Sequence, residues 1–298
     1  MSSNLESSGF IEQYKVPADG RFDIDQVPTS PKDAFGKSKA KKQLASVKRN
    51  LSRLQRSFYA DNRHALLFIF QAMDAAGKDS TIRHVFSGVN PAGFQVYSFK
   101  QPSKEELDHD FLWRSACRLP ERGRIGVFNR SYYEETLVVR VHPEYLHNQR
   151  IPIPSDLDQL WSERFTSIRD HERHLTLNGT TIVKFWLNIS MDEQKRRFLE
   201  RINNPRKNWK FSEHDINERQ HWTAYQAAYE HMIRETSTDY APWYAIPADN
   251  KPMMRLIVAQ IIESTLISLN CTYPELSLKD KAQLSNMSQR LMNESPMS

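Results

Sequence analysis

The chain has 298 residues, of which 39% are hydrophobic and 11% aromatic, and this is enough apolar material for a large packed core. It contains no membrane-length apolar run and lacks the basic-then-apolar start of a signal peptide, so we expect a soluble, cytoplasmic protein with no membrane partner. The net charge of +5 fits either a mildly basic, solvated surface or an anionic partner such as a nucleotide, an inorganic polyanion or a nucleic acid.

The amino-terminal part divides into two regions. Residues 1–37 are polar with scattered Pro and Gly, which predicts an extended arm that lies on the domain or is partly disordered. Residues 38–59 repeat apolar side chains every three or four positions, which predicts an amphipathic helix. No acid occurs between residues 37 and 60, so the other face of this helix is basic. That face is either solvated or attracts a polyanion.

An unbroken apolar run over residues 65–70 predicts a strand buried on both faces, and Gly77 and Lys78 then lead into a helix that begins near Asp79. Backbone N–H groups at a helix N-terminus attract anions, and Lys78 adds a charge that can reach a transferred phosphoryl group. The match to a P-loop is partial, because Ala72 replaces the first Gly and Asp79 replaces the Ser/Thr that binds Mg²⁺. The predicted phosphate-binding residues are Ala75, Ala76, Gly77, Lys78, Asp79 and Ser80.

Strands and helices alternate through the rest of the chain. Further strands are predicted at 94–99, 125–128, 180–187 and 243–246, and helices at 79–87, 103–119, from 132, from 155, from 190, 215–235 and 251–269. This alternation predicts a three-layer α/β/α fold with a parallel sheet. We expect one domain over residues 38–275 and a polar tail over 276–298 that frays from residue 285.

Ligands of such sheets bind at the carboxyl ends of the strands. This rule brings together three segments that follow the first three strands, namely 74–78, 101–104 and Asn129-Arg130.

Four segments then resemble one family, the polyphosphate kinase 2 family: 73–79, 128–133, 208–212 and 241–243. The resemblance extends over residues 39–269 and implies a P-loop kinase-like fold of about five parallel strands, with a helical lid at about 195–225. It also implies phosphate transfer between inorganic polyphosphate and adenine nucleotides with Mg²⁺, or Mn²⁺ in its place. Asn129 and the segment 120–124 are similar to the subgroup that accepts nucleoside mono- and diphosphates, whereas other subgroups carry Asp at position 129.

Phosphoryl transfer is catalysed mainly by positioning and charge, and we assign this role to Asp74, Lys78, Asn129 and Arg130. Asp74 would hold the metal or position the acceptor, unless it only caps its turn. Asp79 is interpreted as a helix cap in preference to a metal ligand. Arg130 can donate two hydrogen bonds to one phosphate, unless it pairs with Glu134 or Glu135.

A basic segment over residues 195–219 would form the lid and bind the polyanion through charge and counterion release. Its predicted polyphosphate-binding residues are Arg201, Lys207, Lys210 and Arg219, each of which could instead be a surface charge or pair with Glu213 or Glu218. The nucleotide-binding residues are predicted to be Lys104, Arg124 and Arg130.

Other side chains are assigned no chemistry. Trp209 and Trp222 are interpreted as packing anchors. The histidines show no metal-ligand spacing, and neither do the two cysteines, Cys117 and Cys271, which fit a reducing compartment.

The predicted function is reversible transfer of the terminal phosphate of polyphosphate to AMP or ADP, which forms ADP or ATP, by a homo-oligomer that does not bind nucleic acid. An ATP-dependent nucleoside monophosphate kinase and a non-catalytic polyanion-binding protein remain alternatives. The basic excess in helix 38–59 and in the lid favours a polyanionic donor, and the chain has no RNA-binding signature.

Overall fold

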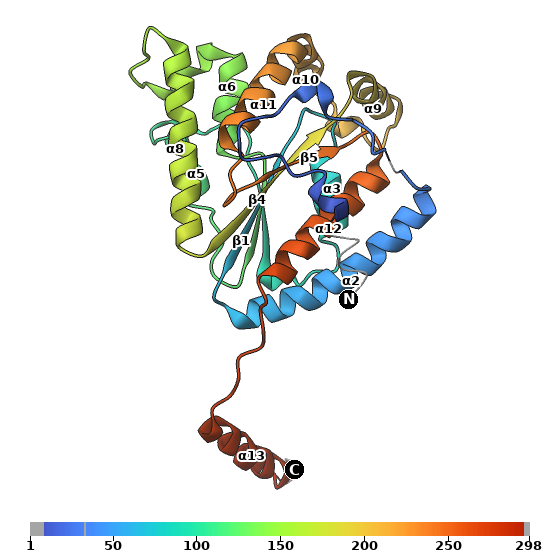
Figure 1. The fold of residues 1–298 in the computed structure, drawn as a ribbon, viewed down its shortest axis with the longest axis vertical. Helices are drawn as coiled ribbons and strands as arrows, with labels where there is room; N and C mark the ends of the chain where they lie inside the picture. The colour runs from blue at the N-terminus through green and yellow to red at the C-terminus, as the bar shows by residue number, and fades with distance from the viewer. Residues whose placement is uncertain (1–8, 33, 295–298) are drawn as a thin grey trace.

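The computed structural model describes residues 9–32 and 34–294, apart from the side chain of Lys210. Its centre is a sheet of five parallel strands in the order β2-β3-β1-β4-β5 (Figure 1). The strands are β1 (Ala65–Gln71), β2 (Phe94–Ser98), β3 (Ile125–Asn129), β4 (Thr180–Asn188) and β5 (Trp243–Pro247). The predicted parallel α/β sheet is thus confirmed.

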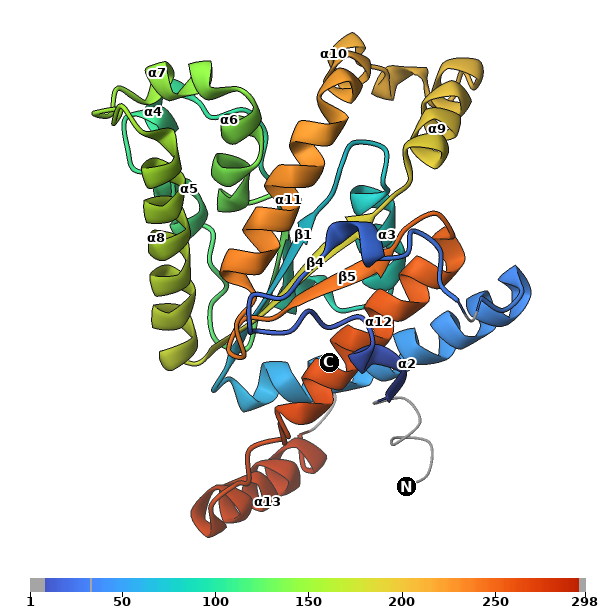
Figure 2. The same cartoon turned by 45° about the horizontal axis from the view of Figure 1, so that its top comes forward.

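Consecutive strands are parallel because a helical crossover connects each one to the next. Helices on both faces bury the central strands, whereas the edge strand β2 is partly exposed. Every residue of β1 is buried, as its continuous apolar sequence requires. On one side of the sheet lie α2 (Lys37–Asp61), α3 (Lys78–Val85) and α12 (Lys251–Ser268), and on the other lie α8 (Leu157–Leu177) and α11 (Trp222–Thr236) (Figures 1 and 2). The amphipathic helix predicted at 38–59 is α2, and its apolar face packs on α12.

The segment predicted to be the lid, called the lid below, consists of α9 (Met191–Asn203), the 3-10 turn η5 (Asn208–Lys210), α10 (Glu213–Asn217) and the 3-10 turn η6 (Glu218–His221). Figure 2 shows α9 and α10 beyond the carboxyl ends of the strands. The single helix predicted at 215–235 is therefore wrong, because η6 separates α10 from α11.

Two other helix predictions are also wrong. Residues 103–119 form two short helices, α4 (Lys104–Leu107) and α5 (Trp113–Ala116), although Ser103 and Glu106 do form the predicted capping box. The segment from 132 is a 3-10 turn, η3 (Tyr132–Thr136), that precedes the short α6 (Val138–Val141), η4 (Pro143–Tyr145) and α7 (Leu146–Gln149). Tertiary packing decides these segments, because each is shorter than a helix that is stable by itself.

A buried ion pair fixes the chain after β3. The Lys184 ammonium lies 2.6 Å from a carboxylate oxygen of Glu172, and both side chains are fully buried. The hydroxyls of Tyr132 and Tyr133 each donate to the other oxygen of Glu172 at 2.8 Å. These bonds anchor η3 to α8 and so position the residues at the end of β3.

The two ends of the described chain differ. Residues 14–16 lie along β5, where the Val16 N–H donates to the Trp243 carbonyl and the Ala245 N–H to the Tyr14 carbonyl. The arm therefore covers an edge of the sheet that would otherwise be exposed. The predicted fraying tail instead forms a helix, α13 (Leu278–Met292), whose first turn is capped by Ser277. Among the described helices, none is both long and apolar enough to cross a membrane.

Candidate active site

A cleft of about 1860 Å³ opens at the carboxyl ends of β1, β2 and β3, beneath the lid. All four predicted catalytic residues line it: Asp74, Lys78, Asn129 and Arg130. They converge because parallel neighbouring strands deliver the chain after β1 and after β3 to the same edge of the sheet.

The loop between β1 and α3 has the shape of an anion-binding turn. Ala75 and Gly77 both have left-handed backbone conformations, with φ of 62° and 110°. Gly77 tolerates this without strain, whereas Ala75 is held there by its surroundings. Helix α3 begins at Lys78, so its first N–H groups and positive dipole end face the cleft.

Lys78 points back into this loop. Its buried ammonium donates to the Ala72 carbonyl at 2.6 Å and to the Met73 carbonyl at 3.4 Å. Burial, together with the nearby charge of Arg130, lowers the pKa of Lys78 to about 8. An anion in the loop would favour the charged form of Lys78 and compete with the two carbonyls for it.

Asn129 and Asp79 form a polar pair at the base of the cleft. The Asn129 amide donates to the Asp79 carboxylate at 2.7 Å and lies 3.3 Å from the Ser98 hydroxyl oxygen. The prediction that Asp79 caps α3 is wrong, because Gly77 is the N-cap and no side chain caps that end. Asn129 Oδ1 is buried and has no hydrogen-bond partner among the described residues.

Arg130 joins two acids. It donates to Asp74 at 2.7 Å and to Glu134 at 3.0 Å, so the alternative of an ion pair with Glu134 is realised and Asp74 is a second partner. Glu135 is not a partner and lies 3.2 Å from Arg164. The Glu134 charge raises the pKa of Arg130, which therefore remains a cation at the cleft surface.

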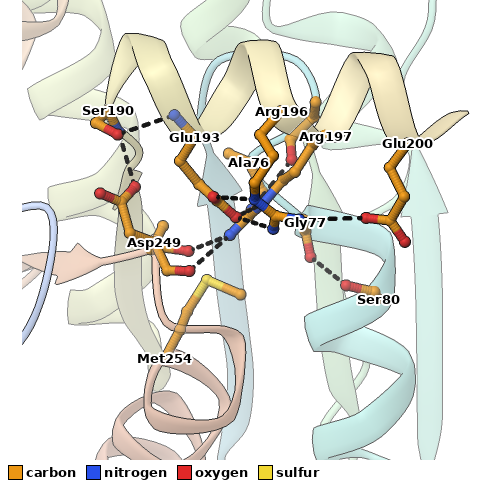
Figure 3. Close-up of polar contacts among 12 residues, drawn as sticks. Ala76, Gly77, Ser80, Ser190, Glu193, Arg196, Arg197, Glu200, Asp249 and Met254 are labelled. Atoms are coloured by element: carbon orange, nitrogen blue, oxygen red, sulfur yellow. Dashed lines mark hydrogen bonds and ion pairs between the residues drawn. The ribbon is translucent and has the colours of Figure 1, made fainter. Parts of the chain in front are cut away.

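Arg197 of α9 braces the loop and was missed by the sequence analysis (Figure 3). Its side chain is only 3% exposed, and one guanidinium nitrogen donates to the carbonyls of Ala75 and Ala76 at 3.1 and 2.6 Å. The other terminal nitrogen donates to the carbonyls of Ala248 and Asp249. The sequence shows only an i,i+4 pair with Glu193, which is the usual sign of a surface ion pair.

The lid cations are mostly paired. Arg201 lies 3.5 Å from Asp215 and Lys207 pairs with Glu200, and all four side chains line the cleft. Their partners are therefore not the predicted Glu213 and Glu218.

The remaining lid predictions have mixed outcomes. Arg219 donates to Gln194 at 2.6 Å and does not line the cleft, and the Lys210 side chain lies outside the described part of the chain. Trp222 packs against the core as predicted, whereas the packing role of Trp209 is wrong because its side chain is 78% exposed beside the cleft.

The three predicted nucleotide-binding residues lie in different parts of the molecule. Arg130 lies in the cleft, whereas Arg124 is at the amino end of β3 with its guanidinium 4.2 Å from the centre of the Tyr59 ring. Lys104 is the first residue of α4 and does not line the cleft. Several other cations do line it, and the sequence analysis missed them: Arg83, Arg114, Arg206, Lys251 and Arg255.

Comparison with known proteins agrees with this geometry. The family model described as polyphosphate kinase 2 matches residues 34–272. An ADP-polyphosphate phosphotransferase of Rhodopseudomonas palustris is 52% identical, over 94% of this chain and 98% of its own, and an AMP/ADP-polyphosphate phosphotransferase of Meiothermus ruber is 45% identical, over 89% and 96%. The crystal structure of polyphosphate kinase 2 from Arthrobacter aurescens superposes with a TM-score of 0.83 at 36% identity, covering 93% of this chain and 96% of that one. This chain belongs to the polyphosphate kinase 2 family.

Proposed function

We propose that this protein transfers the terminal phosphate of inorganic polyphosphate to AMP and ADP, reversibly, and so forms ADP and ATP. The observation that carries the proposal is the loop between β1 and α3, called the phosphate loop below, which faces a cleft with cations on several sides. A phosphorylated substrate at the loop would meet N–H groups of α3 and Lys78, while the rest of a long polyanion would meet the cations that line the cleft.

The reaction needs no strong general base. A terminal phosphate oxygen of the nucleotide attacks the terminal phosphorus of the polyphosphate, and the bridging P–O bond breaks toward the shortened polyphosphate, which keeps the electron pair. Because the attacking oxygen is already anionic at neutral pH, catalysis depends on positioning and on compensating the negative charge. Lys78 and Arg130 would supply that charge, and Arg197 would hold the loop in shape.

Mg²⁺ is the metal that we propose for this site, with Mn²⁺ as an alternative. The donors in the cleft are oxygens, which both ions prefer, and the unpartnered buried Asn129 Oδ1 is an orphaned acceptor beside the Asp79 carboxylate. Asp74, Asp79 and Asn129 are the residues that would hold the ion, so Asp79 gains a role beyond the one expected. When bound, the ion would neutralise phosphate oxygens.

The test is a donor comparison. Purified protein is mixed with Mg²⁺ and AMP or ADP, with polyphosphate or without it, and ADP and ATP are measured. We expect both products only when polyphosphate is present. ADP made from ATP plus AMP at a kinase-like rate, with no product from polyphosphate, would favour the monophosphate kinase, and no reaction at all would favour a polyanion-binding protein.

We extend the proposal to location and assembly. Both cysteines are free thiols, which supports a reducing compartment such as the cytoplasm. A homo-oligomer stays a prediction, supported by the exposed apolar side chains of α13, and light scattering of the purified chain tests it.

A further inference from the structure

Three side chains that suit a metal ion gather outside the cleft, where the base of the lid meets the segment after α6. His142 lies between α6 and η4, and Glu218 and His221 are the first and last residues of η6. One ligand atom from each side chain lies within 4.8 Å of the other two. Over residues 9–32 and 34–294, this is the one group of three His, Cys, Asp or Glu side chains with that arrangement.

The backbone of η6 explains why two of these side chains meet. In a 3-10 helix, residues three apart lie directly above one another, so Glu218 and His221 project from the same face. An α-helix would offset them around its axis. The interruption between α10 and α11 that the sequence analysis missed therefore creates this pair.

Two carboxylates flank the His142 ring, one through a hydrogen bond and one through a longer contact. Its Nε2 lies 3.0 Å from Glu218 Oε2, while its Nδ1 lies 3.4 Å from a carboxylate oxygen of Glu144. A carboxylate behind the other ring nitrogen is the usual support of a metal-binding histidine, because it fixes the tautomer and the direction of the ring. Glu218 is fixed too, since the Tyr225 hydroxyl donates to it at 2.5 Å.

The spacing requires little rearrangement to admit an ion. Tetrahedral Zn²⁺ holds its nitrogen and oxygen ligands at about 2.0–2.2 Å, so neighbouring ligand atoms stand about 3.3 Å apart. The contact between His142 and Glu218 would open by a few tenths of an ångström, and His221, whose ring centre lies 4.9 Å from that of His142, would close on the ion.

The donor set also selects the kind of metal. Two imidazoles and one carboxylate suit Zn²⁺ and related transition metals, whereas Mg²⁺ prefers oxygen ligands and retains its water. His142 and Glu218 are largely shielded from solvent, with 13% and 11% of their side chains exposed, and His221 lies at the open side. An ordinary ion pair between His142 and Glu218 would not explain why the imidazole of His221 lies beside them.

We propose that His142, Glu218 and His221 form a binding site for Zn²⁺ or a similar transition-metal ion, separate from the catalytic cleft. The ion would join η6, at the base of the lid, to the segment that follows α6. Three protein ligands leave a fourth position for water. Because Glu218 directly follows α10, an ion at this site would restrain the base of the lid.

The experiment measures Zn²⁺ binding to the metal-free full chain, in excess Mg²⁺ and without polyphosphate or nucleotide, by competition with a fluorescent chelator. Excess Mg²⁺ occupies oxygen-ligand sites in the cleft and isolates the histidine site. The variants are His142→Gln and His221→Ala. The matched control is His174→Ala, which removes an exposed histidine of α8. Melting temperatures without and with Zn²⁺ are recorded for each variant.

We expect one Zn²⁺ per wild-type chain and a melting temperature that rises with Zn²⁺. Each site variant should bind at least tenfold more weakly and lose that rise, while His174→Ala behaves as wild type. No saturable binding by the wild type, or equal binding by wild type and His221→Ala, would overturn the proposal. If His142→Gln fails to fold, the exposed His221 decides the outcome. Phosphotransferase activity is not the readout, so this test is independent of the proposed function.

Discussion

The phosphate loop and the lid both place cations at the same cleft, but they hold them differently. Around the loop, Lys78 and Arg197 are buried and bonded to backbone carbonyls, so their positions are fixed. In the lid, Lys207 and Arg201 are partly exposed and paired with single carboxylates. Buried, pre-positioned charges stabilise a transition state, whereas exposed charges mainly attract a polyanion. Cations of equal charge in these two regions should therefore affect different kinetic constants.

The largest effect is expected for Lys78→Ala, the fixed cation closest to the loop. Loss of one pre-positioned donor costs about 10²–10³ in kcat, so we expect turnover to fall by roughly 10³-fold, with a much smaller rise in the KM for polyphosphate. Steady-state kinetics at saturating nucleotide measure this. A Lys78→Ala variant that lost donor affinity but kept its turnover would erase the distinction between loop and lid.

Arg197→Met tests the brace, with Arg196→Met as a matched control. Both arginines bond Glu193, but Arg196 is 60% exposed and pairs with acids of its own helix, Glu193 and Glu200, whereas Arg197 holds two loop carbonyls. A loop displaced by about 1 Å can cost about 10²-fold in rate. We expect a loss of that size in kcat for Arg197→Met, and a rate near wild type for Arg196→Met.

Thermal unfolding separates a positioning role from general destabilisation. Breaking a buried ion pair costs roughly 3–5 kcal/mol, against about 0–1 kcal/mol for an exposed one. Arg197→Lys keeps the charge but not the fork of donors. It should regain stability more than rate, and equal recovery of both would argue against a positioning role.

The pH dependence of kcat/KM should report Lys78. Its pKa is lowered to about 8 in the free protein, so the cation is present below that pH and is lost as pH rises through it. We expect kcat/KM for polyphosphate to fall up to tenfold per unit above about pH 8. The fall in kcat should occur at higher pH, because bound phosphate favours the charged lysine.

Lys251 provides the control for this profile. It also lines the cleft, and burial lowers its pKa to about 8 as well. Lys251→Met should keep the alkaline fall and Lys78→Arg should shift it upward, because an arginine stays charged. If the fall instead disappears in Lys251→Met, the titrating group is Lys251.

The smallest effects are expected in the lid. Lys207→Ala and Lys210→Ala should raise the KM for polyphosphate a few-fold at low salt and leave kcat nearly unchanged. Each should reduce the slope of log affinity against log salt by about one charge. Titrations at several salt concentrations test this, and an unchanged slope would mean that these lysines do not contact the donor.

The strands, their order along the chain and the convergence of Asp74, Lys78, Asn129 and Arg130 could all be predicted from the amino-acid sequence alone. Apolar runs identify buried strands, and parallel topology sends the segments after them to one edge. These signals are local or follow from one general rule. Neither signal depends on which side chains from distant parts of the chain are in contact.

The pairing of the charges and the positions at which weak helices break depend instead on contacts between segments far apart in the chain. Arg197 reaches carbonyls more than 120 residues away, and His142 meets Glu218 across 76 residues. Arg124 lies at the amino end of β3, whereas the cleft lies at the carboxyl end. The turn that precedes β3 sets this position, and the sequence motif does not reveal it. The break at η6 has the same origin: short helical segments gain most of their stability from packing, which no local pattern encodes.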